Sequence, residues 1–317
     1  MISRRVLRIK TMQCLYAYFK HSGQTELNKF EKDLYFSIHK SYDLYHSIFI
    51  LLIDIQLFAE KKIELAKSKR LPTQDDLNPN TRFIDNKLIS QLRINSELLR
   101  YAEINKINWA TNPELIKQLH GKLIESDFYS AYMLSESNSY ADDKKLVVDF
   151  LVEILAQNDL FFEILEEQSI FWNDEIEFII DAVIKTTNRF KENSSEGIKL
   201  SPLFKNKDDE DFPKQLLRKV ALNHQDYQKT IEKFCINWEF DRIAFMDILI
   251  MEMAVAEVLE FSSIPTKVTF NEYIELSKYY STAKSNVFVN GILDKIIKHL
   301  KETNQIKKQG RGLIGEK

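Results

Sequence analysis

The sequence predicts an all-α fold, and three observations support this. Only 7 Gly and 6 Pro occur in 317 residues, far fewer than a turn-rich β protein needs. Apolar residues make up 44% and charged residues 29% of the chain, a composition typical of long amphipathic helices. Apolar side chains also recur every three or four positions along most of the chain. The length suits one elaborated domain or two packed ones.

The first helix lies next to the N-terminus and has two distinct stripes. Leu7 and Cys14 recur at helical spacing and predict its packed face. Arg5, Arg8 and Tyr16 fall on a different stripe, which we expect to be exposed. The helix therefore presents cations and an aromatic ring on the side opposite its core.

The remaining helices are expected between polar breaks. The first break is Ser22–Gly23, and another lies at residues 72–82, which are rich in Pro, Asn and Asp. The periodicity after these breaks predicts helices near 27–67 (one long helix or two in line), 85–104, 113–124, 126–134, 143–168, 174–190, 212–235, 239–261, 268–280 and 286–302.

The charge distribution is compatible with polyanion binding at the two ends of the chain. The net charge of -3 argues against a nucleic-acid binder that uses its whole surface. Residues 1–20 nevertheless hold five cations and no acid, and residues 295–317 hold seven Lys or Arg against two Glu. Basic termini can also simply be solvated, and charge alone does not separate the two readings.

Targeting and redox features predict a cytoplasmic protein. The two cysteines, Cys14 and Cys235, lie in apolar-periodic stretches, so a disulfide framework is not indicated. The N-terminal residues have no apolar core of a signal peptide. The most apolar run, Ile48–Ala59, is shorter than the ~18 residues of a membrane span and contains Asp54. We expect a buried helix there, and no membrane association.

No catalytic or cofactor site is expected, so the chain is predicted not to be an enzyme. The six histidines form no metal-binding pattern, and no P-loop or nucleophile elbow occurs. Residues 310–315 fit G-x-G-x-x-G, but too little chain follows for a dinucleotide-binding unit. No cofactor and no metal is expected.

Four blocks resemble a known family. Residues 4–16 read RRVLRIKTMQCLY, which resembles the R-R-x-x-R-x-x-x-x-Q-x-L-Y opening of the transcription antitermination factor NusB family. Residues 264–268 (IPTKV), 271–278 (NEYIELSK) and 288–295 (FVNGILDK) are similar to the family's I-P-x-K-V, N-E-x-x-E-L-x-K and F-V-N-G-V-L-D-K blocks, in the same order. The resemblance covers roughly residues 4–20 and 207–300.

The resemblance implies a function and a set of contact residues. It implies two packed helical bundles that bind boxA-type RNA together with the ribosomal protein NusE, within the transcription elongation complex, and promote ribosomal RNA transcription. The RNA-binding residues it implies are Arg4, Arg5, Arg8, Gln13, Tyr16, Phe288 and Asn290. Glu252 and Glu257 are the candidates for a NusE-facing surface. A homodimer is left open.

The resemblance also implies a domain organisation. An N-terminal bundle is expected over 1–236, with an extended helical insertion at about 24–206, which has no counterpart in short family members. A C-terminal bundle is expected over 237–303, and a basic flexible tail over 304–317. Gly291 lies inside a helix and is expected where a neighbouring element approaches closely.

One segment departs from the family pattern. Residues 280–284 read YSTAK and lack the glycine and acidic residues that the family usually has there. A lysine in place of an acid could strengthen RNA contact or could signal altered partner use.

Two other readings of the function remain open. A helical protein-interaction scaffold is one alternative. A detached relative of the RNA-binding domain of ribosomal RNA methyltransferases is the other, since the chain has no methyl-donor site.

Overall fold

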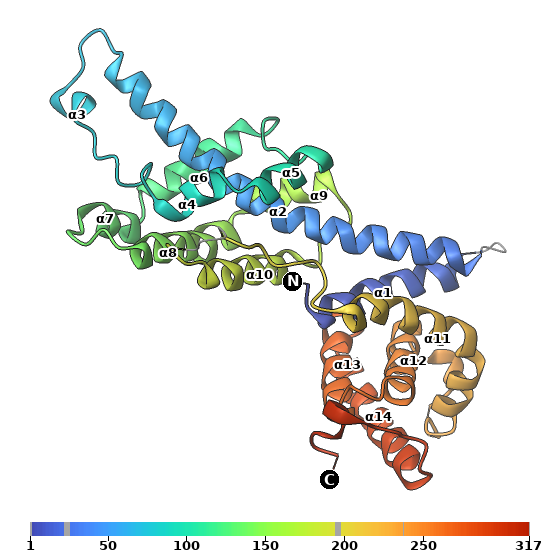
Figure 1. The fold of residues 1–317 in the computed structure, drawn as a ribbon. Coiled ribbons are helices and arrows are strands. Elements are labelled where there is room, and N and C mark those ends of the chain that lie inside the picture. The colour runs from blue at the N-terminus through green and yellow to red at the C-terminus, as the bar shows by residue number, and fades with distance from the viewer. Residues whose placement is uncertain (1, 22–25, 194–197, 237, 317) are drawn as a thin grey trace. The chain divides into compact units, whose positions relative to one another are not determined.

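The computed structural model describes residues 2–21, 26–193, 198–236 and 238–316. Throughout these ranges the regular elements are helices, α1 to α14 with a few short π and 3-10 turns, and no strand occurs in them (Figure 1). The predicted all-α fold class is therefore confirmed. Contacts divide the chain into two compact units. Unit 1 is mainly His39–Leu203, and unit 2 combines Ser3–Ile38 with Phe204–Lys317.

Unit 2 is built around one buried helix. Its elements are α1 (Arg4–Lys20), the start of α2 (Leu27–Lys67), α11 (Lys207–Glu232), α12 (Phe245–Glu260), α13 (Thr266–Tyr280) and α14 (Ser285–Glu302). Every residue from Asp247 to Val258 in α12 is buried. Helices α1, α11, α13 and α14 all pack against α12. A helix that is apolar on all sides needs such an enclosure.

The boundaries of unit 2 differ from the predicted domains. The predicted boundary lies between residues 236 and 237, whereas α11 and α12 on its two sides lie in the same unit. A division of unit 2 into two bundles stays a prediction. The expected insertion at about 24–206 overlaps unit 1, but residue 24 and the break at Ser22–Gly23 lie outside the described residues.

The C-terminal tail has specific contacts where the sequence predicts flexibility. The backbone N–H of Gln309 donates to the carbonyl of Ser262 at 3.0 Å. A Cβ on Gly312 would lie 1.9 Å from that same carbonyl oxygen, so only glycine fits there. The Glu316 carboxylate accepts a 2.7 Å hydrogen bond from the Thr266 N–H. It thereby satisfies an N-terminal donor of α13, which has no side-chain cap of its own.

Helix α2 is one continuous helix of 41 residues, so the open choice between one helix and two is decided. It is long and apolar enough to cross a membrane, with a mean hydropathy of 1.3 over its best window. In the structure, 78% of that window is buried within the protein. The burial fits the sequence prediction of a core helix over Ile48–Ala59.

Unit 1 contains the second part of α2 and a series of shorter helices. They are α3 (Gln74–Leu77), α4 (Lys87–Arg93), α5 (Ser96–Asn105), α6 (Pro113–Ile124), α7 (Asp127–Leu134), α8 (Tyr140–Asp149), α9 (Asp159–Gln168) and α10 (Ile176–Arg189). Two predicted helices, 85–104 and 143–168, are each split in two. Asn95 and Asn158 cause the splits, because their side chains cap α5 and α9.

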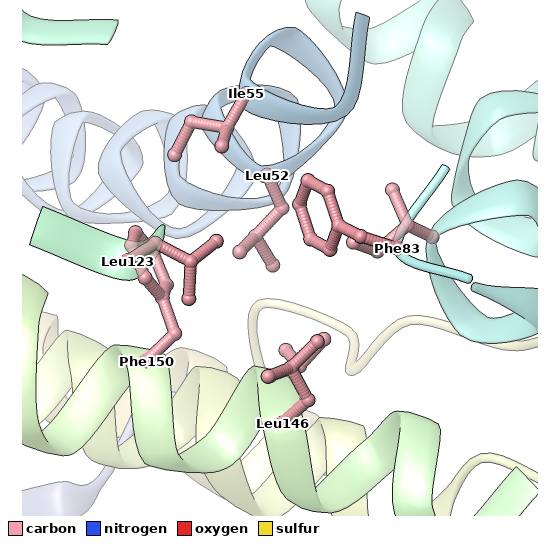
Figure 2. A pocket seen from close by; sticks show the side chains of 8 residues that line it. Leu52, Ile55, Phe83, Leu123, Leu146 and Phe150 are labelled. Atoms are coloured by element: carbon pink, nitrogen blue, oxygen red, sulfur yellow. The ribbon is translucent and has the colours of Figure 1, made fainter. Parts of the chain in front are cut away.

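The core of unit 1 contains a small apolar cavity. Figure 2 shows that Leu52 and Ile55 of α2 face Phe83, Leu123, Leu146 and Phe150 across it. Its volume is about 10 Å³, about one water-sized probe sphere, and its lining offers no polar partner, so it should stay dry. The core is therefore close-packed at this point.

Leu52→Ala should destabilise unit 1 by about 2–5 kcal/mol, because it removes a buried side chain and enlarges an existing cavity. Leu57→Ala on the same helix is the matched control, since Leu57 is 39% exposed. Chemical unfolding followed by circular dichroism measures both variants. Equal losses of stability would show that the side chains around Leu52 do not form a close-packed core.

Candidate nucleic-acid interface

The first two predicted arginines lie at the start of α1 and are paired with acids. Arg4 Nε lies 2.6 Å from Asp209 Oδ1. Arg5 makes two hydrogen bonds of 2.9 Å to the Glu272 carboxylate. The side chains of Arg4 and Arg5 are 31% and 36% exposed. Both guanidinium groups can therefore be reached from solvent, although an acid already occupies part of each donor set.

Arg8 lies in the core, which corrects the expectation that it is exposed beside Arg5. It is 2% exposed and forms two hydrogen bonds, of 2.8 and 2.6 Å, with Glu257 of α12. The hydroxyls of Thr269 and Tyr273 also donate to Glu257, at 2.8 and 3.0 Å. Because the guanidinium is enclosed and its charge is compensated, Arg8 does not present a donor to RNA in this structure.

The environment of Glu257 keeps its carboxylate ionised. Burial alone would raise its pKa, but the Arg8 charge and the hydrogen bonds from Arg8, Thr269 and Tyr273 lower the pKa below its usual value. The same pair raises the pKa of Arg8, against the opposing effect of burial. The pair is thus a buried, fully charged link between α1 and α12.

Glu252 and Glu257 are both fully buried, so the expectation that they face NusE is wrong for this structure. Glu252 Oε2 lies 2.7 Å from His224 Nδ1 of α11. Burial raises the pKa of Glu252, and the histidine only partly offsets this. These two acids face neighbouring helices of unit 2, because α12 is enclosed on all sides.

The C-terminal half of α1 carries an exposed aromatic group. Tyr16 is 43% exposed, and its ring meets Phe245 of α12 edge to face, with centroids 5.7 Å apart. The ammonium group of Lys20 lies 4.1 Å from the centroid of Phe245 and 5.9 Å from that of Tyr16. Gln13, three residues before Tyr16, is half-buried. A cation thus lies directly beside two aromatic rings.

A second aromatic pair lies at the start of α14. Half-buried Phe288 meets Trp238 with centroids 5.0 Å apart and ring planes at 65°. Asn290 is exposed on the same helix. The hydroxyl of Ser285, at the first residue of α14, donates to Asp247 near the start of α12 at 2.8 Å. Both aromatic pairs therefore flank the N-terminal end of α12, and we call Tyr16, Phe245, Trp238 and Phe288 together the aromatic surface.

Three residues of this region, Lys20, Phe245 and Trp238, are not among the contact residues predicted from the sequence. Lys20 follows Tyr16 at i+4, so helical spacing alone could have placed it beside that ring. Phe245 and Trp238 gave no comparable signal, because an aromatic residue next to an apolar helix is usually core. Only the packing of α1 and α14 on α12 shows that these rings reach the surface.

The arrangement suits single-stranded nucleic acid. Exposed rings can stack on unpaired bases, and adjacent cations can neutralise phosphates. Unit 2 holds 25 Lys and Arg against 20 Asp and Glu, whereas unit 1 holds 19 against 27. The aromatic surface thus lies in the unit with excess positive charge. Over the described residues, no group of three side chains could hold a metal ion.

Arg8→Met should destabilise unit 2 by about 3–5 kcal/mol at pH 7, because it leaves Glu257 buried without its cation. Arg5→Met should cost at most about 1 kcal/mol, since that pair is partly exposed. The double change Arg8→Met with Glu257→Leu should recover most of the loss. Urea unfolding followed by circular dichroism measures all three, and equal effects of Arg8→Met and Arg5→Met would contradict the buried link.

The pH dependence of the Arg8→Met defect provides a second check. In the parent protein, the lowered pKa of Glu257 gives stability that is full above about 4.5 and is lost as the pH falls. Without Arg8, burial should instead raise the pKa of Glu257, so stability should be lost as the pH rises. The difference between parent and variant should therefore shrink between pH 7 and pH 4.

Comparisons with known proteins agree on one family. The family model described as NusB family matches residues 179–298. A transcription antitermination protein NusB from Salinibacter ruber is 40% identical over 114 residues, which are 36% of this chain and 71% of that protein. The namesake from Chloroherpeton thalassium is 43% identical over 104 residues, 33% of this chain and 49% of its own.

A third relative of the same name, from Natranaerobius thermophilus, is 40% identical over 85 residues, 27% of this chain and 61% of its own length. No solved structure matches the chain. The family recognised from the sequence blocks is confirmed by these matches. The region that the family model matches contains the three C-terminal blocks, whereas residues 4–16 and most of unit 1 lie outside it. The chain belongs to the NusB family.

Proposed function

We propose that the chain acts in transcription antitermination as an RNA-binding adaptor and catalyses no reaction. Its curated relatives are named transcription antitermination proteins. The observation that carries the proposal is the exposed contact of Tyr16, Phe245 and Lys20. Rings and a cation at one exposed place are what single-stranded RNA requires for stacking and phosphate contact.

The finer proposal is that the RNA is a boxA-type element of ribosomal RNA transcripts, bound together with NusE in the cytoplasmic elongation complex. It is supported by the four sequence blocks shared with the family. Arg4 and Arg5 remain RNA candidates, because partly exposed ion pairs are worth only about 0–1 kcal/mol. A phosphate group can therefore compete with Asp209 and Glu272 for them. Arg8 is left out of this set.

The charge of unit 1 favours a second role for the chain, in addition to RNA binding. Its excess of acidic residues disfavours contact with a polyanion over much of its surface. We propose that the insertion serves as a protein-interaction module attached to the RNA-binding unit. The alternative of a detached methyltransferase RNA-binding domain has no specific support in the structure.

Tyr16→Ala should weaken binding of a boxA-containing single-stranded RNA by roughly 1–3 kcal/mol, because a stacking contact is lost. The slope of log affinity against log salt should change little. Lys20→Ala should instead reduce that slope by about 0.7, as expected for one lost phosphate contact on a single strand. Filter-binding titrations over a salt series measure both.

Tyr279→Ala is the matched control for these titrations, because Tyr279 is 76% exposed on α13 and belongs to neither aromatic pair. It should bind RNA as the parent does. If Tyr16→Ala and Lys20→Ala also match the parent at every salt concentration, this end of α1 is not the RNA surface.

NusE should bind the chain, and its addition should raise the affinity for boxA-containing RNA. Isothermal calorimetry with purified NusE, followed by RNA titration with and without it, measures the two effects. A scrambled RNA of the same length is the control for sequence preference. No heat and no co-migration at micromolar concentrations would favour the protein-interaction scaffold over the joint RNA platform.

A further inference from the structure

One end of unit 1 is basic and carries exposed leucines. We call residues 61–71 the basic arm; they comprise the last turns of α2 and the segment that follows it. Leu65 and Leu71 are 60% and 87% exposed there, and no residue of the next helix, α3, is buried. Figure 1 shows that these segments stand apart from the other helices of unit 1. Large apolar side chains left in water often mark a binding surface.

The charges of the basic arm are only partly compensated inside the protein. Residues 61–71 hold five Lys or Arg and a single Glu. Two of the lysines pair with nearby acids, but Lys61, Lys62 and Arg70 are exposed and form no ion pair with an acid among the described residues. Lys61 and Lys62 lie four and three residues before Leu65, so they flank it on the helix surface. The arm therefore presents an apolar side chain beside two unpaired cations.

Helix α9 of the same unit carries the opposite charge. Residues 146–184, which include α9, hold ten Asp or Glu and no Lys or Arg. The exposed acids of α9 lie at i, i+4, i+7 and i+8, which is one face of the helix. They are Asp159, Glu163, Glu166 and Glu167. Within the described part of the chain, no ion pair joins this acidic face to a cation.

The acidic face destabilises α9 itself. Glu163 is four residues from both Asp159 and Glu167, and like charges at this spacing repel each other on a helix. Glu166 and Glu167 also lie in the last turn, where the helix dipole disfavours negative charge and no basic residue offsets it. Since the described contacts of unit 1 do not compensate this repulsion, the face favours a cationic partner from outside.

The basic arm and the acidic face have matching spacing. Glu166 and Glu167 lie four and three residues before Ile170, which is 78% exposed just after the end of α9. The two unpaired lysines of the arm hold the same positions relative to Leu65. Each patch is thus an exposed aliphatic side chain preceded by two like charges, and the charges of the two patches are opposite.

The two patches of one chain are too far apart to meet. Trp172, two residues after Ile170, donates its indole N–H to the carbonyl of Lys40 in α2 at 2.7 Å. Ile170 therefore lies near the level of Lys40 along α2. Leu65 is 25 residues further along this continuous helix, and the helical rise makes this about 38 Å. A contact between the two patches needs a second copy of the chain.

A second copy also fits the basic arm better than a nucleic acid does. Unpaired cations attract RNA as well, but Leu65 and Leu71 are aliphatic and offer no ring on which a base can stack. The acidic face of α9, with Ile170 at its end, supplies both carboxylates and an apolar side chain at the matching spacing.

We propose that the basic arm of one copy of this chain docks on the acidic face of α9 in a second copy. The two lysines of the arm pair with the last carboxylates of α9, and Leu65 packs against Ile170. Because each copy carries both patches, a two-fold arrangement lets both contacts form at once. The inference rests on the proposed role of unit 1 as a protein-interaction module and names its partner.

Sedimentation velocity of the full-length protein over a concentration series tests this contact. The parent should dimerise at low ionic strength, and about 1 M salt should largely dissociate the dimer, because the Debye length falls to about 3 Å. Lys61→Glu with Lys62→Glu should weaken dimerisation at least about 10-fold, because like charges then face each other across the interface. Glu166→Lys with Glu167→Lys should have the same effect.

A mixture of these two double variants provides the sharpest check. In the mixture each acidic arm meets a basic α9 and each basic arm meets an acidic α9, so a mixed dimer should form. Lys117→Glu with Lys122→Glu is the matched control, because both lysines are exposed on α6 of the same unit. This control has the net charge of the arm variant and should dimerise as the parent does. Circular dichroism melting should show that all three double variants remain folded.

The outcomes separate this contact from the proposed RNA binding. A parent that stays monomeric at every concentration would overturn the contact, as would a dimer that neither double variant weakens or a mixture that forms no dimer. Reduced RNA affinity of the arm variant with an unchanged dimer would assign the arm to RNA and also overturn it. If the parent dimerises as expected but binds no boxA-containing RNA, the RNA-binding function fails while the docking surface stands.

Discussion

The buried pair of Arg8 and Glu257 is the contact on which unit 2 depends. It joins two segments 249 residues apart in the chain and draws Thr269 and Tyr273 of α13 into one hydrogen-bond network. Two charges without water are tolerated only when each satisfies the other. The pair therefore requires α1 to lie on α12, whatever the length of the chain inserted between them.

This pair also determines which end of α1 is available for contact with another molecule. Arg8 meets Glu257 near the C-terminal end of α12, while Tyr16 meets Phe245 at its N-terminal end. The two helices thus run antiparallel, and the arginine end of α1 is largely occupied by acids of unit 2. The tyrosine end, with Lys20, remains open, which favours it as the main RNA contact of this helix.

The packing of α1 on α12 also explains how the chain accommodates the long insertion. Unit 2 closes around Ser3–Ile38 and Phe204–Lys317, so the intervening residues can form a unit with its own apolar core. The apolar stretch of α2 contributes to that core, since 78% of its most apolar window is buried. Acidic residues are in excess in unit 1 and basic residues in unit 2. This difference in charge favours different binding partners for the two units.

The sequence by itself determined the all-α fold, most helix positions and the family. These follow from low glycine and proline content, from apolar spacing and from contiguous motif blocks, which are all local properties. The tertiary structure alone decided the burial of Arg8, Glu252 and Glu257, the open space around Gly291, where the sequence wrongly predicts a close neighbour, and the contact of Trp238 with Phe288. A charged residue on a helix stripe is expected to be exposed unless an opposite charge arrives from elsewhere in the chain. Whether such a partner arrives depends on how distant helices pack, and helical spacing carries no information about it.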